Sequence, residues 1–151
     1  MKSFRAYSFH NMKDLVQIRM INTISNFYLD TTPNTIAKYT FNNCEKLTNY
    51  PYKNTIKIRY VRENAFNNAQ SMPDISLDYI EVAEHSAFYK YNGKITLGVN
   101  LTSVGNRAFN YVKFKNLNII ANQLTELKDE VFSLTNINSF EGKNLSRLGN
   151  N

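Results

Sequence analysis

The residue types best suited to recognising a partner gather in one stretch of the first half of the chain. Tyrosine and arginine carry much of the energy of protein interfaces, and both also stack on or pair with nucleic acids. This basic cluster consists of Tyr50, Tyr52, Lys53, Lys57, Arg59, Tyr60 and Arg62. Three interpretations are open for it: a solvated strand face, a contact with a protein, or a contact with a nucleic acid.

The other chemically active side chains are too scattered for catalysis or metal binding. Neither His10 nor His85 has a cysteine or a second histidine at ligand spacing. The neighbouring acids that an acid–base mechanism would need are Glu81 with Glu84 and Asp129 with Glu130. Solvated charge explains both pairs better, because no pocket is implied around them, and the dispersed glycines form no phosphate-binding loop. We therefore expect no enzyme activity, no cofactor and no metal site.

A repeating backbone must position these residues, because a small residue followed by phenylalanine recurs along the chain. The six phenylalanines are Phe9, Phe41, Phe66, Phe88, Phe109 and Phe132, at steps of 32, 25, 22, 21 and 23 residues. An apolar or small residue lies five positions before each of them, and an apolar segment follows. Each unit offers two short strands and one tight turn, too few elements to bury their own apolar faces, so the units must stack. The alternative is an ordinary globular domain whose aromatic residues coincide by chance.

The unit from Leu101 to Leu124 resembles the BspA-like leucine-rich repeat. The stretch LTSVG at 101–105, followed by Ala108 and Phe109, is close to that consensus, and 41–48 carries its FxxCxxL half. The resemblance implies an α/β leucine-rich-repeat solenoid, curved, with short parallel strands and tight helical turns, formed by a single domain, 1–151. Its units lie near 1–31, 32–56, 57–78, 79–99, 100–122 and 123–143, with a partial unit at 144–151.

The resemblance also implies that the second strand of each unit lines a concave parallel sheet. Asp74 and Asp78 lie near the middle of that array, where a ligand on the concave face would make its most central contacts, so we add them to the candidate partner-binding residues. The side chains expected to point outward from the second strands are Gln17, Arg19, Thr48, Asn49, Asp74, Ser76, Thr96, Asn118, Ile119, Asn138 and Ser139. This list assumes an alternation that a slip of one residue would reverse.

The single cysteine, Cys44, excludes a disulfide framework within the chain and fits a reducing compartment. It falls where the repeat requires a small buried residue, and a buried thiol is inert, so a structural role is favoured. The first fifteen residues have several charges and no apolar run of signal-peptide length, and no run approaches a membrane span. We therefore expect a cytoplasmic protein without a membrane partner.

Charge is distributed in blocks. Residues 1–62 carry a net charge of +7, residues 63–84 carry −5, residues 85–115 carry +5 and residues 116–151 carry −1. In a solenoid such blocks become spatial slabs, and alternating slabs can steer and orient a complementary partner. The 23 asparagines suit tight corners, because asparagine tolerates the left-handed backbone conformation.

These observations predict a binding module without chemistry of its own, and a protein is the expected ligand. The partner would contact the concave face, an uncapped end of the array, or both, for example as a host protein in a host–pathogen or phage–host interaction. An uncapped end would also permit a homo-oligomer, because an exposed terminal unit leaves apolar surface and an unpaired edge. Two alternatives are open: a nucleic-acid-binding protein that uses the basic cluster, and a structural subunit of a larger, viral assembly.

Overall fold

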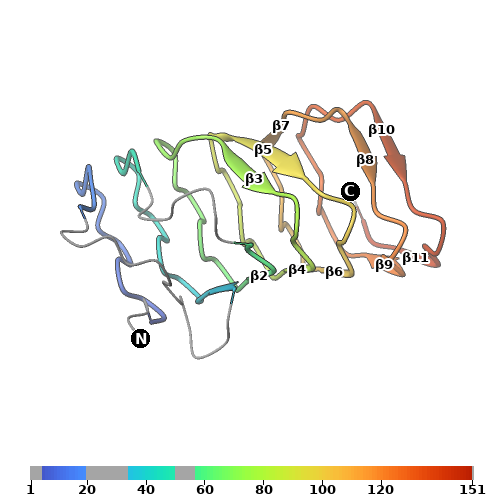
Figure 1. The fold of residues 1–151 in the computed structure, drawn as a ribbon, viewed down its shortest axis with the longest axis horizontal. Helices are drawn as coiled ribbons and strands as arrows, with labels where there is room; N and C mark the ends of the chain where they lie inside the picture. Colours follow the sequence, from blue (N-terminus) through green and yellow to red (C-terminus); the bar gives the residue numbers. More distant parts are fainter. Residues whose placement is uncertain (1–4, 20–33, 50–56, 151) are drawn as a thin grey trace.

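The chain winds into a parallel β-solenoid, in which short strands lie before and after the repeated phenylalanines (Figure 1). The computed structural model describes residues 5–19, 34–49 and 57–150. The first strands are β1 (Thr35–Ile36), β2 (Tyr60–Val61), β4 (Val82–Ala83), β6 (Ser103–Val104), β9 (Glu126–Leu127) and β11 (Arg147–Leu148). The second strands are β3 (Ile75–Leu77), β5 (Lys94–Leu97), β7 (Lys113–Phe114), β8 (Asn118–Ile120) and β10 (Ser139–Glu141).

Strands of successive units pair in parallel, on two sides of the solenoid. On the first-strand side the order is β1-β2-β4-β6, with β11 paired to β9 beyond it. On the second-strand side the sheets are β3-β5-β7 and β8-β10. This stacking of repeats confirms the solenoid that the sequence predicts.

The repeated phenylalanines form one continuous stack through the core. Their rings lie face to face in chain order, with centroids 5.3–5.6 Å apart and interplanar angles of 20° or less. The four inner rings are fully buried, while Phe9 and Phe132 at the two ends of the described stack are half-buried. Beside this stack, Ile36, Val61 and Ala83 lie in register on adjacent first strands and are also buried. The sequence period therefore translates directly into rows of stacked side chains.

The turns that carry the phenylalanines are β-turns, so the expected helical turns are not confirmed. No residue in the described part of the chain is helical, and no helix there has the length and apolarity to cross a membrane. The N–H of Phe66, for example, donates to the carbonyl of Ala87 in the next unit (2.8 Å), whereas that of Asn67 donates back to Asn64 (3.3 Å). A helix would use every N–H group within its own segment, but here alternate groups bind the neighbouring unit.

We call these inter-unit hydrogen bonds the turn ladder. In the units of Phe9, Phe41, Phe66, Phe88 and Phe109, three N–H groups donate to the following unit: those of the phenylalanine and of the residues two before and two after it. In the unit of Phe132, Glu130 makes the corresponding bond to Asn150. The two flanking residues have positive φ angles in all six units: Tyr7, Asn11, Tyr39, Asn43, Asn64, Asn68, Ser86, Lys90, Arg107, Tyr111, Glu130 and Leu134. Four of these twelve are asparagine, as expected for tight corners, and the other eight adopt a conformation that costs ordinary side chains free energy.

Asparagine has a second use between units, which the sequence did not predict. The side-chain Oδ1 of Asn116 accepts the N–H of Leu97 (3.0 Å), and its Nδ2 donates to the carbonyl of the same residue (2.9 Å). The amide side chain thus replaces a peptide group of a neighbouring strand. Asn49 and Asn136 form the same pair of bonds with Ile18 and Phe114.

Changing Leu134 to asparagine should stabilise the fold by about 0.5–1 kcal/mol, because asparagine relieves much of the steric cost of a left-handed residue. Leu134 has a φ of 56° and is 64% exposed, so the change removes little buried surface. Urea denaturation of the wild-type chain and the variant measures the difference. Leu117 provides the control, because it is also exposed but has no positive φ. An equal rise in the free energy of unfolding for Leu117→Asn would contradict the explanation by the left-handed conformation.

Candidate protein-interaction surface

The structure describes four members of the predicted basic cluster, Lys57, Arg59, Tyr60 and Arg62. Tyr50, Tyr52 and Lys53 lie outside the described residues. Lys57 stands over the ring of Tyr79, with its Nζ 4.7 Å from the ring centroid.

Both arginines of this cluster form ion pairs with glutamates of the next unit. Arg59 Nε lies 2.7 Å from Glu81 Oε1, and Arg62 NH1 lies 2.7 Å from Glu84 Oε1. The hydroxyl of Tyr60 donates to the second oxygen of Glu81 (2.9 Å). The hydrogen bond from Arg59, followed by that from Tyr60, lowers the pKa of Glu81. The basic and acidic blocks therefore neutralise each other across a unit boundary, which leaves these arginines less available to an outside anion.

Asp74 and Asp78 are exposed, and both are engaged within the chain. Asp74 Oδ1 accepts the N–H of Lys94 (2.8 Å), and Oδ2 lies 3.0 Å from Lys115 Nζ. The backbone bond from Lys94, and then the side chain of Lys115, lower the pKa of Asp74. Asp78 accepts a hydrogen bond from the hydroxyl of Ser76 (2.5 Å). Their contact with a partner stays a prediction.

The outward-facing residues of the second strands are as predicted, with one correction. Ile119 is 1% exposed and belongs to the core, while its neighbours Asn118 and Ile120 face outward on β8. The alternation on β8 therefore confirms Asn118 as outward-facing and shows that Ile119 was wrong. The remaining ten residues of the predicted set are exposed or half-exposed.

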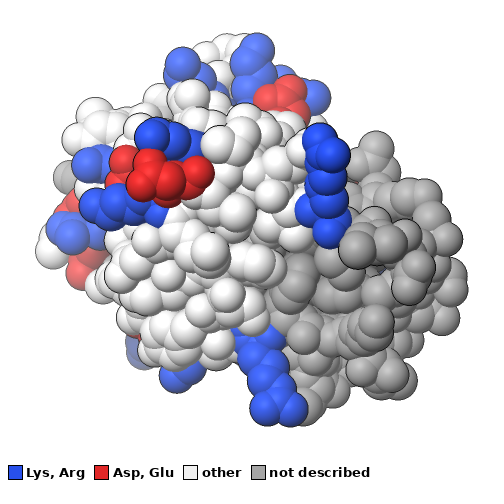
Figure 2. All heavy atoms as spheres, turned by 90° about the vertical axis from the view of Figure 1, so that its left-hand side faces the viewer, with Lys and Arg blue, Asp and Glu red and all other residues white. Residues whose placement is uncertain are grey.

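The described part of the solenoid end at the first unit shows a largely uncharged surface with charged side chains around it (Figure 2). Tyr7, Met12 and Val16 are 50%, 45% and 54% exposed there. Residues 1–4 and 20–33 lie outside the described part of the chain. Docking at an uncapped end, including the homo-oligomer, therefore stays a prediction.

A shallow groove of about 670 Å³ crosses the turns of the second to fifth units. Its lining is mixed in charge and mostly polar: Glu45, Lys46, Gln70, Ser71, Lys90, Tyr91, Asn92 and Tyr111. We call it the turn groove.

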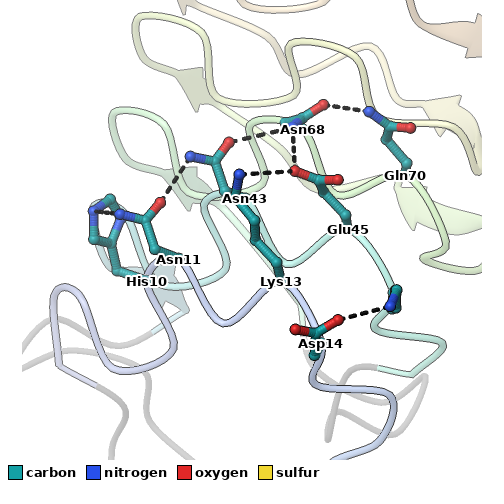
Figure 3. Close-up of polar contacts among 9 residues, drawn as sticks. His10, Asn11, Lys13, Asp14, Asn43, Glu45, Asn68 and Gln70 are labelled. Atoms are coloured by element: carbon teal, nitrogen blue, oxygen red, sulfur yellow. Dashed lines mark hydrogen bonds and ion pairs between the residues drawn. The ribbon is translucent and has the colours of Figure 1, made fainter.

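Two residues that line the turn groove, Glu45 and Gln70, belong to a ladder of amide side chains, which we call the amide ladder (Figure 3). Asn43 Nδ2 donates to Asn11 (2.8 Å) and Asn68 Nδ2 donates to Asn43 (3.3 Å). Asn68 also accepts a hydrogen bond from the amide of Gln70 (2.5 Å) and donates to Glu45 (3.3 Å). These bonds join three units and fix the side chains of the amide ladder in place.

Two further lining residues, Lys90 and Tyr111, form a cluster with Tyr89, which we call the Tyr–Lys wall. Lys90 Nζ lies 5.2 Å from the ring centroid of Tyr89 and 5.7 Å from that of Tyr111. The two rings meet edge to face, 6.0 Å apart, and Tyr111 is 49% exposed. No ion pair neutralises Lys90 among the described residues. Sequence reasoning missed this wall, although adjacent units place these residues next to the repeated phenylalanines within the second basic block.

The remaining reactive groups have structural surroundings. Cys44 is buried, its thiol donates to the carbonyl of Phe9 (2.9 Å), and burial raises its pKa to about 11, so the thiol is protonated at neutral pH. The ring of His10 lies within hydrogen-bond distance of the side-chain amides of Asn11 and Asn42. No group of three or more His, Cys, Asp and Glu side chains suited to a metal occurs in the described ranges.

Comparison with known proteins gives one match. A family model described as a BspA type leucine rich repeat region, in six copies, matches residues 1–92 and 20–138. Searches of curated proteins and of solved structures find no match.

Proposed function

Because this chain belongs to the BspA-type leucine-rich repeat family, we propose that it is a protein-interaction module that acts by binding and has no enzymatic activity, and that its partner occupies the turn groove. The observation that carries the choice of surface is the Tyr–Lys wall. The exposed Tyr111 and the unneutralised Lys90 line a polar groove there, with the half-buried Tyr89 beside them, whereas Arg59 and Arg62 are paired within the chain.

Tyrosine is well suited to an interface core, because it buries a large rigid surface and retains a hydroxyl for hydrogen bonding. Tyr111 offers about half of its surface to a partner. Its backbone N–H donates to the carbonyl of Ser133 (3.1 Å) in the turn ladder, so its position is fixed before binding. A fixed wall reduces the entropy lost when a complex forms.

The amide of Gln70 supports the same proposal. It lines the groove, and its hydrogen bond to Asn68 (2.5 Å) orients it before binding. An amide side chain can bind the peptide groups of an incoming chain. A groove lined by tyrosine and amide side chains therefore fits a polypeptide better than it fits a small reactive substrate.

The Tyr111→Ala variant tests this proposal with a partner captured from the source organism. We expect its affinity to fall by a factor of about 10–100, as for an interface residue of central importance. Tyr79→Ala is the matched control, since Tyr79 is 48% exposed and also lies under a lysine, Lys57. Isothermal titration calorimetry measures both variants. Equal affinities for Tyr111→Ala and the wild-type chain, or a larger loss for Tyr79→Ala, would exclude the turn groove.

The nucleic-acid alternative has its own test. Single- and double-stranded DNA and RNA are titrated over a salt series, because binding through phosphates weakens steeply with salt. Tight binding at low salt that disappears as salt rises would favour this alternative.

A further inference from the structure

Four lysines lie on the solenoid beside the Tyr–Lys wall, three of them on or next to the second strands of the fourth and fifth units. Lys90 belongs to the wall, Lys94 lies on β5, Lys113 lies on β7 and Lys115 follows β7. All four are exposed. We call them the lysine surface.

The arrangement of these lysines concentrates positive charge. Lys94 and Lys113 are partners in the parallel register of β5 and β7, so their Cα atoms are about 4.8 Å apart. Like charges at directly opposed positions destabilise a sheet unless something neutralises them. Lys113 and Lys115 are two residues apart and therefore extend from the same side of the strand.

Within the described part of the chain, Asp74 is the carboxylate that an ion pair connects to this surface. It accepts the backbone N–H of Lys94 and pairs with the side chain of Lys115 (3.0 Å). Lys90, Lys94 and Lys113 form no ion pair among the described residues, so positive charge is in excess on this surface. An excess of this kind attracts an anionic partner and orients it.

We infer that the lysine surface binds an extended acidic segment of the partner protein, through carboxylates at alternate positions of that segment. Side chains two residues apart on an extended chain recur about every 6.6 Å, and Lys113 and Lys115 are likewise two residues apart, on either side of the buried Phe114. Such a segment would leave the turn groove past Lys90 and continue over β5 and β7. This inference rests on the proposed function, since it assigns the chemistry of the same partner.

The geometry of the tyrosines favours an acidic polypeptide over a nucleic acid. Single-stranded nucleic acids bind by stacking their bases on open aromatic faces. Here Lys90 lies over the rings of both Tyr89 and Tyr111, and the rings meet at 89°.

A fluorescein-labelled peptide of alternating glutamate and serine provides the probe, and a glutamine–serine peptide provides the neutral comparison. Fluorescence anisotropy at low salt should show binding of the acidic peptide alone. The double variant Lys94→Glu, Lys113→Glu should weaken that binding by about tenfold or more. The matched control is Lys38→Glu, Lys128→Glu, which changes the net charge equally at two exposed lysines elsewhere and should bind nearly as the wild type does.

Several outcomes would overturn the inference: no binding of the acidic peptide at low salt, equal losses in the two double variants, or tighter binding of a single-stranded oligonucleotide than of the peptide. Circular dichroism melting shows that each variant is folded before its binding is compared. The captured partner separates the two proposals. If Tyr111→Ala weakens its binding and the lysine reversal does not, the inference fails and the proposed function stands. If neither variant weakens the binding of the captured partner, the inference and the proposed function both fail.

Discussion

The Phe109→Ala variant is expected to lose about 3–5 kcal/mol of its free energy of unfolding. Phe109 is fully buried, and its ring stacks on Phe88 (5.5 Å between centroids) and on Phe132 (5.6 Å). A third ring, that of Phe114, lies 5.7 Å away in a tilted arrangement. Alanine would leave a cavity in the middle of the stack and remove the contact between neighbouring units.

Urea denaturation measures this loss, and alanine variants of the other stacked phenylalanines provide the comparison. Phe88→Ala should be similar, because Phe88 is also fully buried between two stacked rings. Phe132→Ala should cost less, because Phe132 is half-buried. Unchanged stability in all three variants would show that the stack does not hold the units together.

Replacing Gly105 with alanine should destabilise the chain by about 1–3 kcal/mol or more, since it forces an extra methyl group against backbone. A Cβ at this position would lie 2.3 Å from the N atom of His85 and 2.6 Å from the carbonyl carbon of Glu84. Gly105 also donates its N–H to the carbonyl of Ala83 (2.8 Å), which fixes it close to the preceding unit. The methyl group can be accommodated only if β4 and β6 separate.

Gly142→Ala is the control for this prediction. Its Cβ would lie 2.9 Å from a ring atom of Phe140 and 3.4 Å from Leu145 Cβ, both of them side-chain atoms. Because a side chain can move aside more easily than the backbone, Gly142→Ala should lose less stability than Gly105→Ala. Thermal unfolding of both variants tests the comparison. A larger loss for Gly142→Ala would contradict the backbone-contact explanation.

Ion pairs between adjacent units neutralise part of the charge in the basic and acidic blocks. Arg59 with Glu81, Arg62 with Glu84 and Arg107 with Glu130 each join one unit to the next. Stacking sets side chains of adjacent units beside each other, so opposite charges one repeat apart in sequence meet in space. Alternating blocks then contribute to cohesion between units, and an outside partner meets chiefly the charges that have no counterpart, such as Lys90 and Lys113.

Much of the fold follows from the sequence alone. The repeat of Phe with its small preceding residue identifies the core, because units too small to bury their own apolar side chains must place equivalent ones in contact. The burial of Cys44 follows from its place in the repeat. The outward direction of most second-strand residues follows from alternation along a strand. The prediction for Ile119 is wrong because successive strand residues face opposite sides, so Ile119 cannot share the outward direction of Asn118.

The tertiary structure alone decided how the turns are built and which surface is available. A turn of given sequence can direct its N–H groups inward, as a helix does, or toward a neighbour, and the outcome depends on the carbonyls that the next unit presents, such as that of Ala87 to Phe66. Arg59 and Arg62 have the residue types of a binding site, but their glutamate partners lie more than twenty positions away in the sequence. The Tyr–Lys wall likewise exists only where two units meet, because Lys90 and Tyr111 become neighbours through stacking and not through sequence.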